Sequence, residues 1–244
     1  MLRSTNIQRR KTNKVVDAKS RLLAHLPARE GKSFLGLCDT VELTFGQVLA
    51  EPDVRIRDVY FPVTGFVSLI APVGPDTSLE VGLIGAEGML GATLALGIDL
   101  APLHALVQGA GTALHMSAAA FRRELLARPA LRAVMLRYCY VLLRQVSQTA
   151  ACTHFHSIEA RLARWLLMTQ DRAIGASLHL TQEFLSSMLG VRRVGVTEAA
   201  GKLQSRRLIG YHRGEITVLN RSGLEAASCS CYLEDKRLYR LTLG

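Results

Sequence analysis

Residues 180–204 read LTQEFLSSMLGVRRVGVTEAAGKLQ, and their spacing predicts two short helices joined by a tight turn. Thr181 is placed to cap the first helix, and Gly190 falls at the turn, where a left-handed backbone favours glycine. Ser186 supplies the small side chain that two crossing helices need. The apolar residues at the buried positions of such a pair are Leu185, Leu189, Val191, Val196 and Ala199. This agreement favours a helix-turn-helix over an unrelated helical hairpin.

The second helix is expected to run from about Arg192 to Arg206 and to enter the major groove of DNA by its N-terminal end. An arginine there can donate two hydrogen bonds to a guanine edge, whereas basic residues further along the helix are better placed for phosphates. The expected DNA-binding residues are Thr181, Gln182, Arg192, Arg193, Thr197, Lys202, Gln204, Arg206, Arg207, His212 and Arg213.

A hairpin is expected directly after this pair of helices. Residues 208–212 and 215–219 are short apolar segments joined by Arg213 and Gly214, which is typical of a β-hairpin wing. His212 and Arg213 would lie at its tip. His212 then either approaches DNA or is a solvated turn residue, and the sequence does not choose between the two.

Three helices are predicted before residue 180. Ser117 and Ser157 are placed as N-caps of helices over 117–127 and 158–173, the second ended by Gly175. Between them, residues 130–152 form a long helical pattern without proline or glycine. Its apolar seam repeats at alternating four and three, and we expect this seam to pair with a twin helix in a homodimer. The seam residues are Leu131, Met135, Tyr138, Leu142, Gln145 and Thr149.

The same long helix carries a second apolar stripe, Leu136, Cys139, Leu143 and Val146, which we expect to cover the preceding domain. A helix that is apolar on two faces needs two partners. The alternative is a single helix buried in the core of one domain.

Residues 36–116 are predicted to be rich in β-strands. Short apolar segments such as 59–70 and 79–84 alternate with turn signals such as Gly74-Pro75-Asp76, which favours an antiparallel barrel or jelly roll. Residues 100–121 lack charged side chains but contain breakers, so they indicate buried strands rather than a membrane span. The expected fold class is α+β.

Charge is distributed unevenly along the chain, whose formal net charge is +10. Residues 22–116 are acidic, whereas the expected flexible tail at 1–20 and residues 117–221 are basic. This indicates a sensing module joined to a polyanion-binding one. The five cysteines are scattered and no secretion signal is apparent, which favours the cytoplasm.

At this point the sequence resembles the cyclic-AMP receptor / fumarate-nitrate regulator (Crp/Fnr) superfamily. The resemblance lies in residues 180–204, in 157–167, and in the glycine-punctuated segments 45–47, 61–67 and 88–91. It implies a sequence-specific transcription regulator that binds a two-fold-symmetric operator on double-stranded DNA as a homodimer and contacts RNA polymerase. The implied parts are a tail (1–20), a cyclic-nucleotide-binding-like β-roll (21–128), a dimerisation helix (129–156) and a winged helix-turn-helix (157–244).

The sequence departs from the family pattern at the effector pocket. Ala92 follows Gly91 where the family has a ribose-binding glutamate, and Leu103-His104 replaces its Arg-Ser pair. We therefore expect that cAMP does not bind. The residues expected to line a pocket for an unidentified ligand are Glu80, Gly88, Gly91 and His104. Val194 and Glu198 replace two DNA-reading residues of the family, so a different operator is expected.

Few other residues suggest chemistry. Cys229-Ser-Cys231 is a single C-x-C pair without a third and fourth ligand, so we interpret it as structural or incidental and expect no metal site and no cofactor. His154 and His156 are interpreted as residues of a hinge rather than as haem or metal ligands. No catalytic motif appears, so an enzyme is not expected. The main rival is a metal- or haem-dependent jelly-roll sensor or enzyme of the cupin kind, for which His104 and His115 would be the strand histidines. A basic membrane-associated or RNA-binding protein is the third reading.

Overall fold

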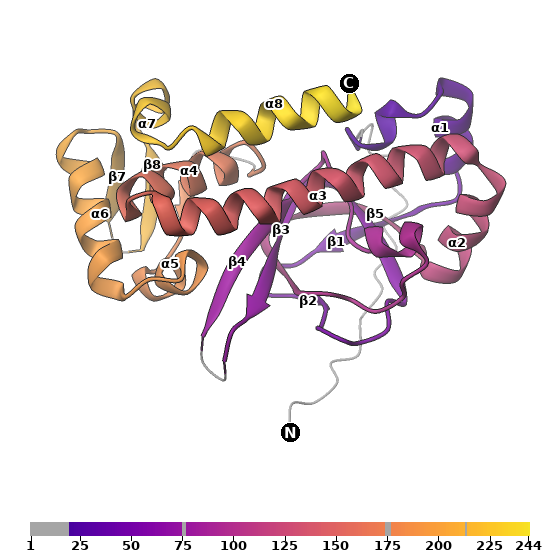
Figure 1. Ribbon diagram of the computed structural model, residues 1–244, viewed down its shortest axis with the longest axis horizontal. Helices are drawn as coiled ribbons and strands as arrows, with labels where there is room; N and C mark the ends of the chain where they lie inside the picture. The colour runs from indigo at the N-terminus through magenta and orange to yellow at the C-terminus, as the bar shows by residue number, and fades with distance from the viewer. Residues whose placement is uncertain (1–19, 75–76, 174–176, 213) are drawn as a thin grey trace.

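The computed structural model describes residues 20–74, 77–173, 177–212 and 214–244, without the side chains of residues 177–179. The expected tail up to residue 19, Gly175 and Arg213 lie outside these residues. The described chain forms a β-roll, a long helix that lies across it, and a domain of short helices and strands at one end of that helix (Figure 1).

The β-roll is an antiparallel sheet in the order β1-β5-β3-β4, with β2 paired to β5. Its strands are β1 (Asp39–Leu43), β2 (Val48–Ala50), β3 (Asp58–Pro72), β4 (Ser78–Ile84) and β5 (His104–Ser117). Short helices η1 (Leu23–His25), α1 (Ala28–Leu35) and η2 (Ala92–Leu96) complete it. The strands expected at 59–70 and 79–84 are confirmed. Gly65 has a φ of +75°, and a Cβ there would collide with the Gly109 carbonyl of β5, so this crossing of strands requires glycine.

Three helices follow the roll, as the sequence predicts: α2 (Ala118–Ala127), α3 (Pro129–Phe155) and α4 (Ile158–Gln170). The hydroxyl of Ser117 accepts a hydrogen bond from the backbone N–H of Ala120, and that of Ser157 accepts one from Ala160. Both expected caps are therefore confirmed. His156 has an extended backbone, with a φ of −111° and a ψ of 146°, and separates α3 from α4. None of the described helices is long and apolar enough to cross a membrane.

The expected assignment of the two apolar faces of α3 is wrong for most of their residues. Leu131, Met135 and Tyr138 of the expected dimer seam are at most 2% exposed, because they pack against the roll of the same chain. Of the other seam residues, Gln145 is 9% exposed, and Leu142 and Thr149 are half-buried. In the second stripe, Leu136 and Leu143 are instead 38% and 63% exposed, whereas Cys139 and Val146 are half-buried and pack against apolar clusters of the roll, as expected. An apolar repeat shows that a face needs cover, but it does not say which partner covers it.

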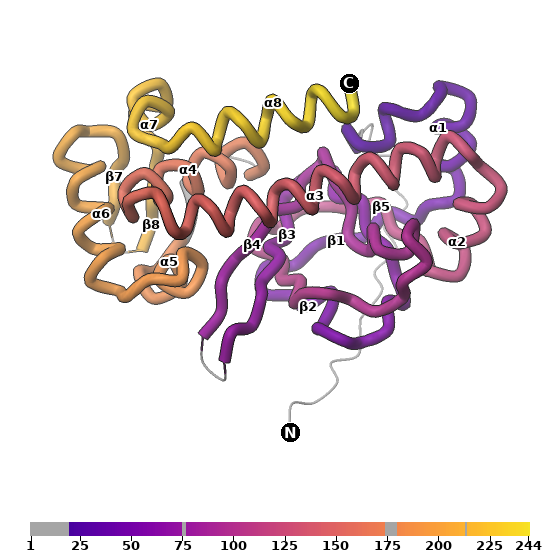
Figure 2. Tube along the Cα trace, in the orientation of Figure 1, coloured from indigo at the N-terminus to yellow at the C-terminus, as the bar shows by residue number. Residues whose placement is uncertain are grey.

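The last helix, α8 (Cys231–Leu243), lies against α3 rather than within the DNA-binding domain to which residues 157–244 were assigned (Figure 2). Leu243 is buried in the same apolar cluster as Leu131 and Met135. The hydroxyl of Tyr239 donates a hydrogen bond of 2.9 Å to the backbone carbonyl of Glu87, at the end of the roll. The C-terminal helix thus packs along α3 and also contacts the end of the roll.

Polar contacts between buried groups hold the roll against α4. Trp165 donates its indole N–H to Glu80 Oε1 at 2.7 Å, and the hydroxyl of Ser68 donates to Glu80 Oε2 at 2.5 Å. Arg172 binds Glu87 at 2.6 Å nearby. Burial raises the pKa of the Glu80 carboxyl to about 7, although its two hydrogen bonds oppose the rise. Burial between the roll and α4 therefore favours the protonated form of Glu80.

We predict that Glu80→Gln makes the protein less sensitive to pH. The folded chain holds the Glu80 proton more tightly than the unfolded chain does, so the stability that this group contributes is complete below about pH 4.5 and is lost as the pH rises through about 7. The free energy of urea unfolding of the wild type should fall between pH 5 and pH 8 by more than that of the variant. Glu42→Gln on the exposed side of β1 is the control. Equal pH dependence in the wild type and Glu80→Gln would contradict the prediction.

Candidate nucleic-acid interface

Two helices form the predicted helix-turn-helix: α5 (Gln182–Leu189) and α6 (Arg193–Ser205). The hydroxyl of Thr181 accepts a hydrogen bond of 3.1 Å from the backbone N–H of Phe184, which caps α5. Gly190 has a φ of +61°, the left-handed conformation that the sequence predicts for the turn. Leu185 and Val196 are fully buried and hold the two helices together.

A small sheet and one further helix complete this domain. Strands β6 (Ser177–His179), β7 (Ile209–His212) and β8 (Glu215–Val218) pair in the order β6-β8-β7, and α7 (Arg221–Ala227) follows. The expected wing is the hairpin of β7 and β8, in which His212 pairs with Glu215. The His212 side chain is exposed.

Three of the expected DNA-binding residues lie together where α5 and α6 begin. The side-chain carbonyl oxygen of Gln182 accepts hydrogen bonds from Thr197 Oγ1 at 3.0 Å and from Arg193 Nε at 3.4 Å. Arg192 is the exposed N-cap residue of α6, and Val194 is 61% exposed beside it. The first turns of α6 therefore present donors, an acceptor and an apolar side chain to the solvent.

The other expected contacts lie at the far end of α6. Lys202, Gln204, Arg206 and Arg207 are all exposed there. Arg206 forms an ion pair of 2.9 Å with Glu159 in the first turn of α4, so part of its charge is neutralised within the protein. Arg207 has a φ of +55°, which turns the chain out of α6 and into the wing. This end of the helix thus has the basic charge that suits phosphate contacts.

The roll fixes the position of the helix pair through α5. The hydroxyls of Ser187 and Ser78 lie 3.0 Å apart, and Gln108 of β5 donates a hydrogen bond of 3.1 Å to the sulfur of Met188. The side chain of Leu79 packs against the turn at Gly190. Because α5 faces the roll, α6 is left on the outer edge of the molecule (Figure 1).

The structure does not bring the expected effector-pocket residues together. Glu80 faces Trp165 of α4, whereas His104 pairs with Glu51 at 2.7 Å near the surface. Gly88 lies against the Tyr138 hydroxyl, and Gly91, with a φ of +94°, lies against Val59 and Ile56. The resemblance to the family grouped these residues, but their side chains meet different elements.

A cavity of about 410 Å³ lies outside the roll, between α3, the end of α4 and α8. Its wall is part aromatic and part charged, and includes Tyr138, Gln145, Arg172, Lys236 and Tyr239. None of these residues is predicted from the sequence to line a pocket, because α8 forms one side of the cavity and nothing in the sequence predicts where α8 packs.

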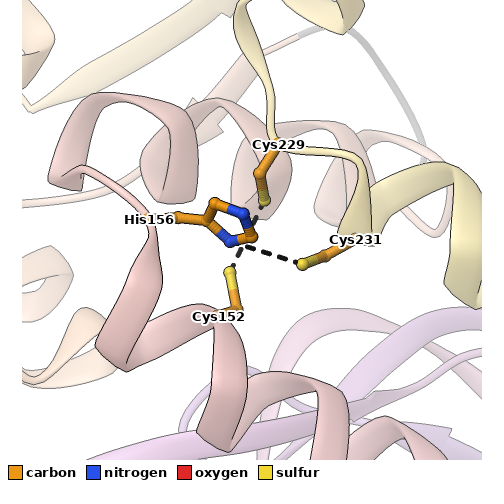
Figure 3. Close-up of side chains that lie close together, drawn as sticks. All are labelled: Cys152, His156, Cys229 and Cys231. Carbon is orange, nitrogen blue, oxygen red and sulfur yellow. Dashed lines mark hydrogen bonds between the residues drawn. The ribbon is translucent and has the colours of Figure 1, made fainter.

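Four side chains from separate parts of the sequence converge near the α3–α4 junction (Figure 3). They are Cys152 from the last turn of α3, His156 at the junction, Cys229 from the segment between α7 and α8, and Cys231, the first residue of α8. Their ligand atoms all lie within 4.8 Å of one another. The expectation that the C-x-C pair lacks further ligands is therefore wrong.

The thiols of this cluster are held in contact. The sulfur atoms of Cys152 and Cys229 are 3.5 Å apart, and Cys231 Sγ lies 3.5 Å from His156 Nδ1. The hydrogen bond from Cys229 lowers the pKa of the Cys152 thiol, with a further contribution from the charge of Arg164. The sequence offers only two short signals for this cluster, a C-x₃-H pair at 152–156 and a C-x-C pair at 229–231. Because the two pairs are far apart in the chain, their spacing does not predict that they meet.

Residues 160–227 match the family model of the Crp-like helix-turn-helix domain. No curated protein sequence matches the chain. Among solved structures, FixK2 from Bradyrhizobium japonicum is similar at a TM-score of 0.66 and 15% identity, over 79% of this chain and 98% of that one. CLP, a c-di-GMP responsive global regulator from Xanthomonas campestris, is similar at 0.63 and 18%, over 79% and 99%. A CRP-family transcriptional regulator from Thermus thermophilus is similar at 0.63 and 16%, over 77% and 95%.

The structural similarities identify the fold, and the match over residues 160–227 identifies the DNA-binding domain. Both agree with the α+β architecture of roll, long helix and winged helix-turn-helix that the sequence predicts. Residues 160–227 are therefore a Crp-like helix-turn-helix domain, and the fold of the described chain is similar to that of solved transcriptional regulators of the CRP family.

Proposed function

We propose that the protein binds a palindromic operator as a homodimer and regulates transcription there, in contact with RNA polymerase. The observation that carries the proposal is the exposed start of α6, where Gln182, Arg193 and Thr197 are gathered at the end that enters a major groove. The charge of the C-terminal half agrees with a polyanion partner.

Arg193 is the best base-reading residue in this arrangement. Its guanidinium can donate two hydrogen bonds to the O6 and N7 atoms of a guanine, once Gln182 releases or shares it. Val194 is 61% exposed next to it, and its methyl groups suit contact with the methyl group of a thymine. Lys202, more than two turns further along α6, is placed for phosphate.

The exposed face of α3 supports dimerisation, with a seam different from the one that the sequence predicts. Its exposed residues repeat at alternating four and three: Leu136, Tyr140, Leu143, Ser147 and Ala150. This is the spacing with which two parallel helices pack in a two-fold dimer. Leu143, which is 63% exposed, lies at the middle of this seam. A second copy of α3 is the occupant that matches its length and its repeat.

The interior of the roll argues against a cyclic nucleotide there. The cluster inside it is apolar and includes Leu43, Tyr60, Val67, Leu69 and Val107. A buried cyclic phosphate needs a guanidinium or several backbone donors to replace its lost hydration. His104, which stands with Leu103 where the family has its Arg-Ser pair, is instead paired with Glu51. We propose that the effector is absent or is a different ligand.

The cupin-like alternative has less support. Its metal site would require histidines and carboxylates that converge within the roll. The two strand histidines are instead each bound to a separate acid, His104 to Glu51 and His115 to Asp58 at 2.8 Å. Among the described residues, neither histidine belongs to a group of side chains close enough to share a metal ion.

We predict different effects for the two ends of α6. Arg193→Ala should weaken operator binding by about 1–3 kcal/mol and relax the base preference at one position of each half-site. Lys202→Ala should weaken binding to all sequences alike and reduce the salt dependence. Selection of bound DNA from a random pool, followed by salt titration, measures both effects. An unchanged sequence preference in Arg193→Ala would refute the assignment of this residue.

We predict that Leu143→Glu abolishes dimerisation. A carboxylate in the centre of the α3 seam would be buried without a partner, so light scattering should show a monomer that binds the operator poorly. Leu126→Glu, at a position that is 85% exposed on α2, is the matched control and should remain dimeric. The two half-sites of the wild-type operator should lie about 34 Å apart. A monomeric wild type would contradict the proposal.

We predict that calorimetry detects no binding of cAMP at micromolar concentration. Cyclic GMP and cyclic di-GMP, measured in the same way, show whether another cyclic nucleotide takes its place. The physical reason is that the described interior of the roll is an apolar cluster, in which a charged phosphate would lose its hydration. Micromolar cAMP binding that also tightens operator affinity would overturn this part of the proposal.

A further inference from the structure

We propose that Cys152, His156, Cys229 and Cys231 bind one Zn²⁺ ion that fixes the joint between α3 and the DNA-binding domain. The four residues come from two segments far apart in the chain, and their side chains point to a common centre (Figure 3). Three sulfur ligands and one imidazole nitrogen form the Cys₃His set that is typical of structural zinc. With four protein ligands the site is closed, so it has no open position for catalysis.

The distances fit a single tetrahedral ion. Zinc–sulfur and zinc–nitrogen bonds of about 2.3 and 2.0–2.1 Å place the ligand atoms of a tetrahedron about 3.6–3.8 Å apart. The Cys152 and Cys229 sulfur atoms are 3.5 Å apart, the Cys231 sulfur and the His156 Nδ1 are also 3.5 Å apart, and all pairs lie within 4.8 Å. An iron–sulfur cluster, which places several atoms between its ligands, would need a wider arrangement.

The charges around the cluster also fit the ion. Arg161 and Arg164 of α4 are 8% and 6% exposed, and Asp235 is the carboxylate that binds Arg164, at 2.7 Å. Arg161 donates to the backbone carbonyl of Leu189 rather than to an acid. Zinc with three thiolates and a neutral imidazole carries one net negative charge, which together with Asp235 balances the two buried guanidinium groups.

A second layer of contacts orients the ligands. The side-chain amide of Gln148 donates a hydrogen bond of 2.9 Å to the sulfur of Cys231. Donors of this kind stabilise a thiolate and fix its direction toward a metal. Gln148 belongs to α3, one turn before Cys152, so the same helix provides a ligand and supports another.

The position of the site explains what the metal would do. It ties the last turn of α3 and the α3–α4 junction to the segment from which α8 begins. His156 is the residue at which the chain changes direction between the long helix and the DNA-binding domain. A metal here would restrict that joint and hold the start of α8 against α3, which sets where α6 lies relative to the dimer axis.

A disulfide between Cys152 and Cys229 is the competing explanation. A disulfide bond is about 2.05 Å long and would leave Cys231 and His156 without a shared role. The metal measurement is therefore done under reducing, anaerobic conditions, in which only the metal site predicts bound zinc.

The test measures metal in the full-length protein. Elemental analysis of wild-type protein should give one zinc per chain. Cys229→Ser should lose it, whereas Cys38→Ser and Cys139→Ser, which replace cysteines outside the cluster, should keep it. After zinc is removed with a chelator, Co²⁺ should produce the visible bands of a tetrahedral ion and a thiolate charge-transfer band. His156→Cys should retain cobalt with a stronger charge-transfer band, because a fourth thiolate replaces the imidazole.

The cobalt spectrum of the wild-type protein tests the site directly. The test therefore still decides the proposal if one of the variants fails to fold. Zinc-free wild type that takes up no Co²⁺ under reducing conditions would overturn the proposal. Cobalt bands that persist in Cys229→Ser but vanish in Cys139→Ser would overturn it as well, since the metal would then lie elsewhere. Neither outcome bears on DNA binding through α6, which is measured separately.

Discussion

Burial of one apolar face of α3 is the constraint on which the rest of the molecule depends. Leu131, Met135 and Tyr138 pack in one apolar cluster with Phe61 of the roll and with residues of α1 and α2. Large apolar side chains contribute roughly 1.5–3 kcal/mol each when they are fully buried, so this contact fixes the helix on the roll. Leu136, Tyr140 and Leu143 of α3 then remain exposed, and α8 packs along the same helix.

The DNA-binding domain follows directly after the C-terminal end of α3. Because α3 ends at Phe155, the orientation of α6 depends on what restrains the joint at His156. Three sets of contacts act there: Glu80 with Trp165, Arg172 with Glu87, and α5 with the roll through Ser78 and Ser187. The Cys/His cluster is a fourth restraint on the same joint. The orientation of the DNA-binding domain therefore depends on several polar contacts at this joint.

The β-roll supports the helices that pack on it. Its described interior contains a large apolar cluster, while the buried His115 pairs with Asp58 and the buried Glu80 reaches Trp165 of α4. Contacts such as those of Glu80 with Trp165 and of Glu87 with Arg172 join the roll to the DNA-binding domain. The cavity between α3 and α8 lies next to those contacts and shares Arg172 with them.

The sequence by itself determined the features that depend on near neighbours in the chain. The caps at Ser117, Ser157 and Thr181 and the turn at Gly190 follow from hydrogen bonds and backbone angles within a few residues. Only the tertiary structure decided which face of α3 is buried, where α8 packs, and that Cys152 and His156 meet Cys229 and Cys231. The physical reason is that apolar periodicity specifies a need for burial without naming the partner, and ligand groups far apart in sequence become a site only when packing brings them together.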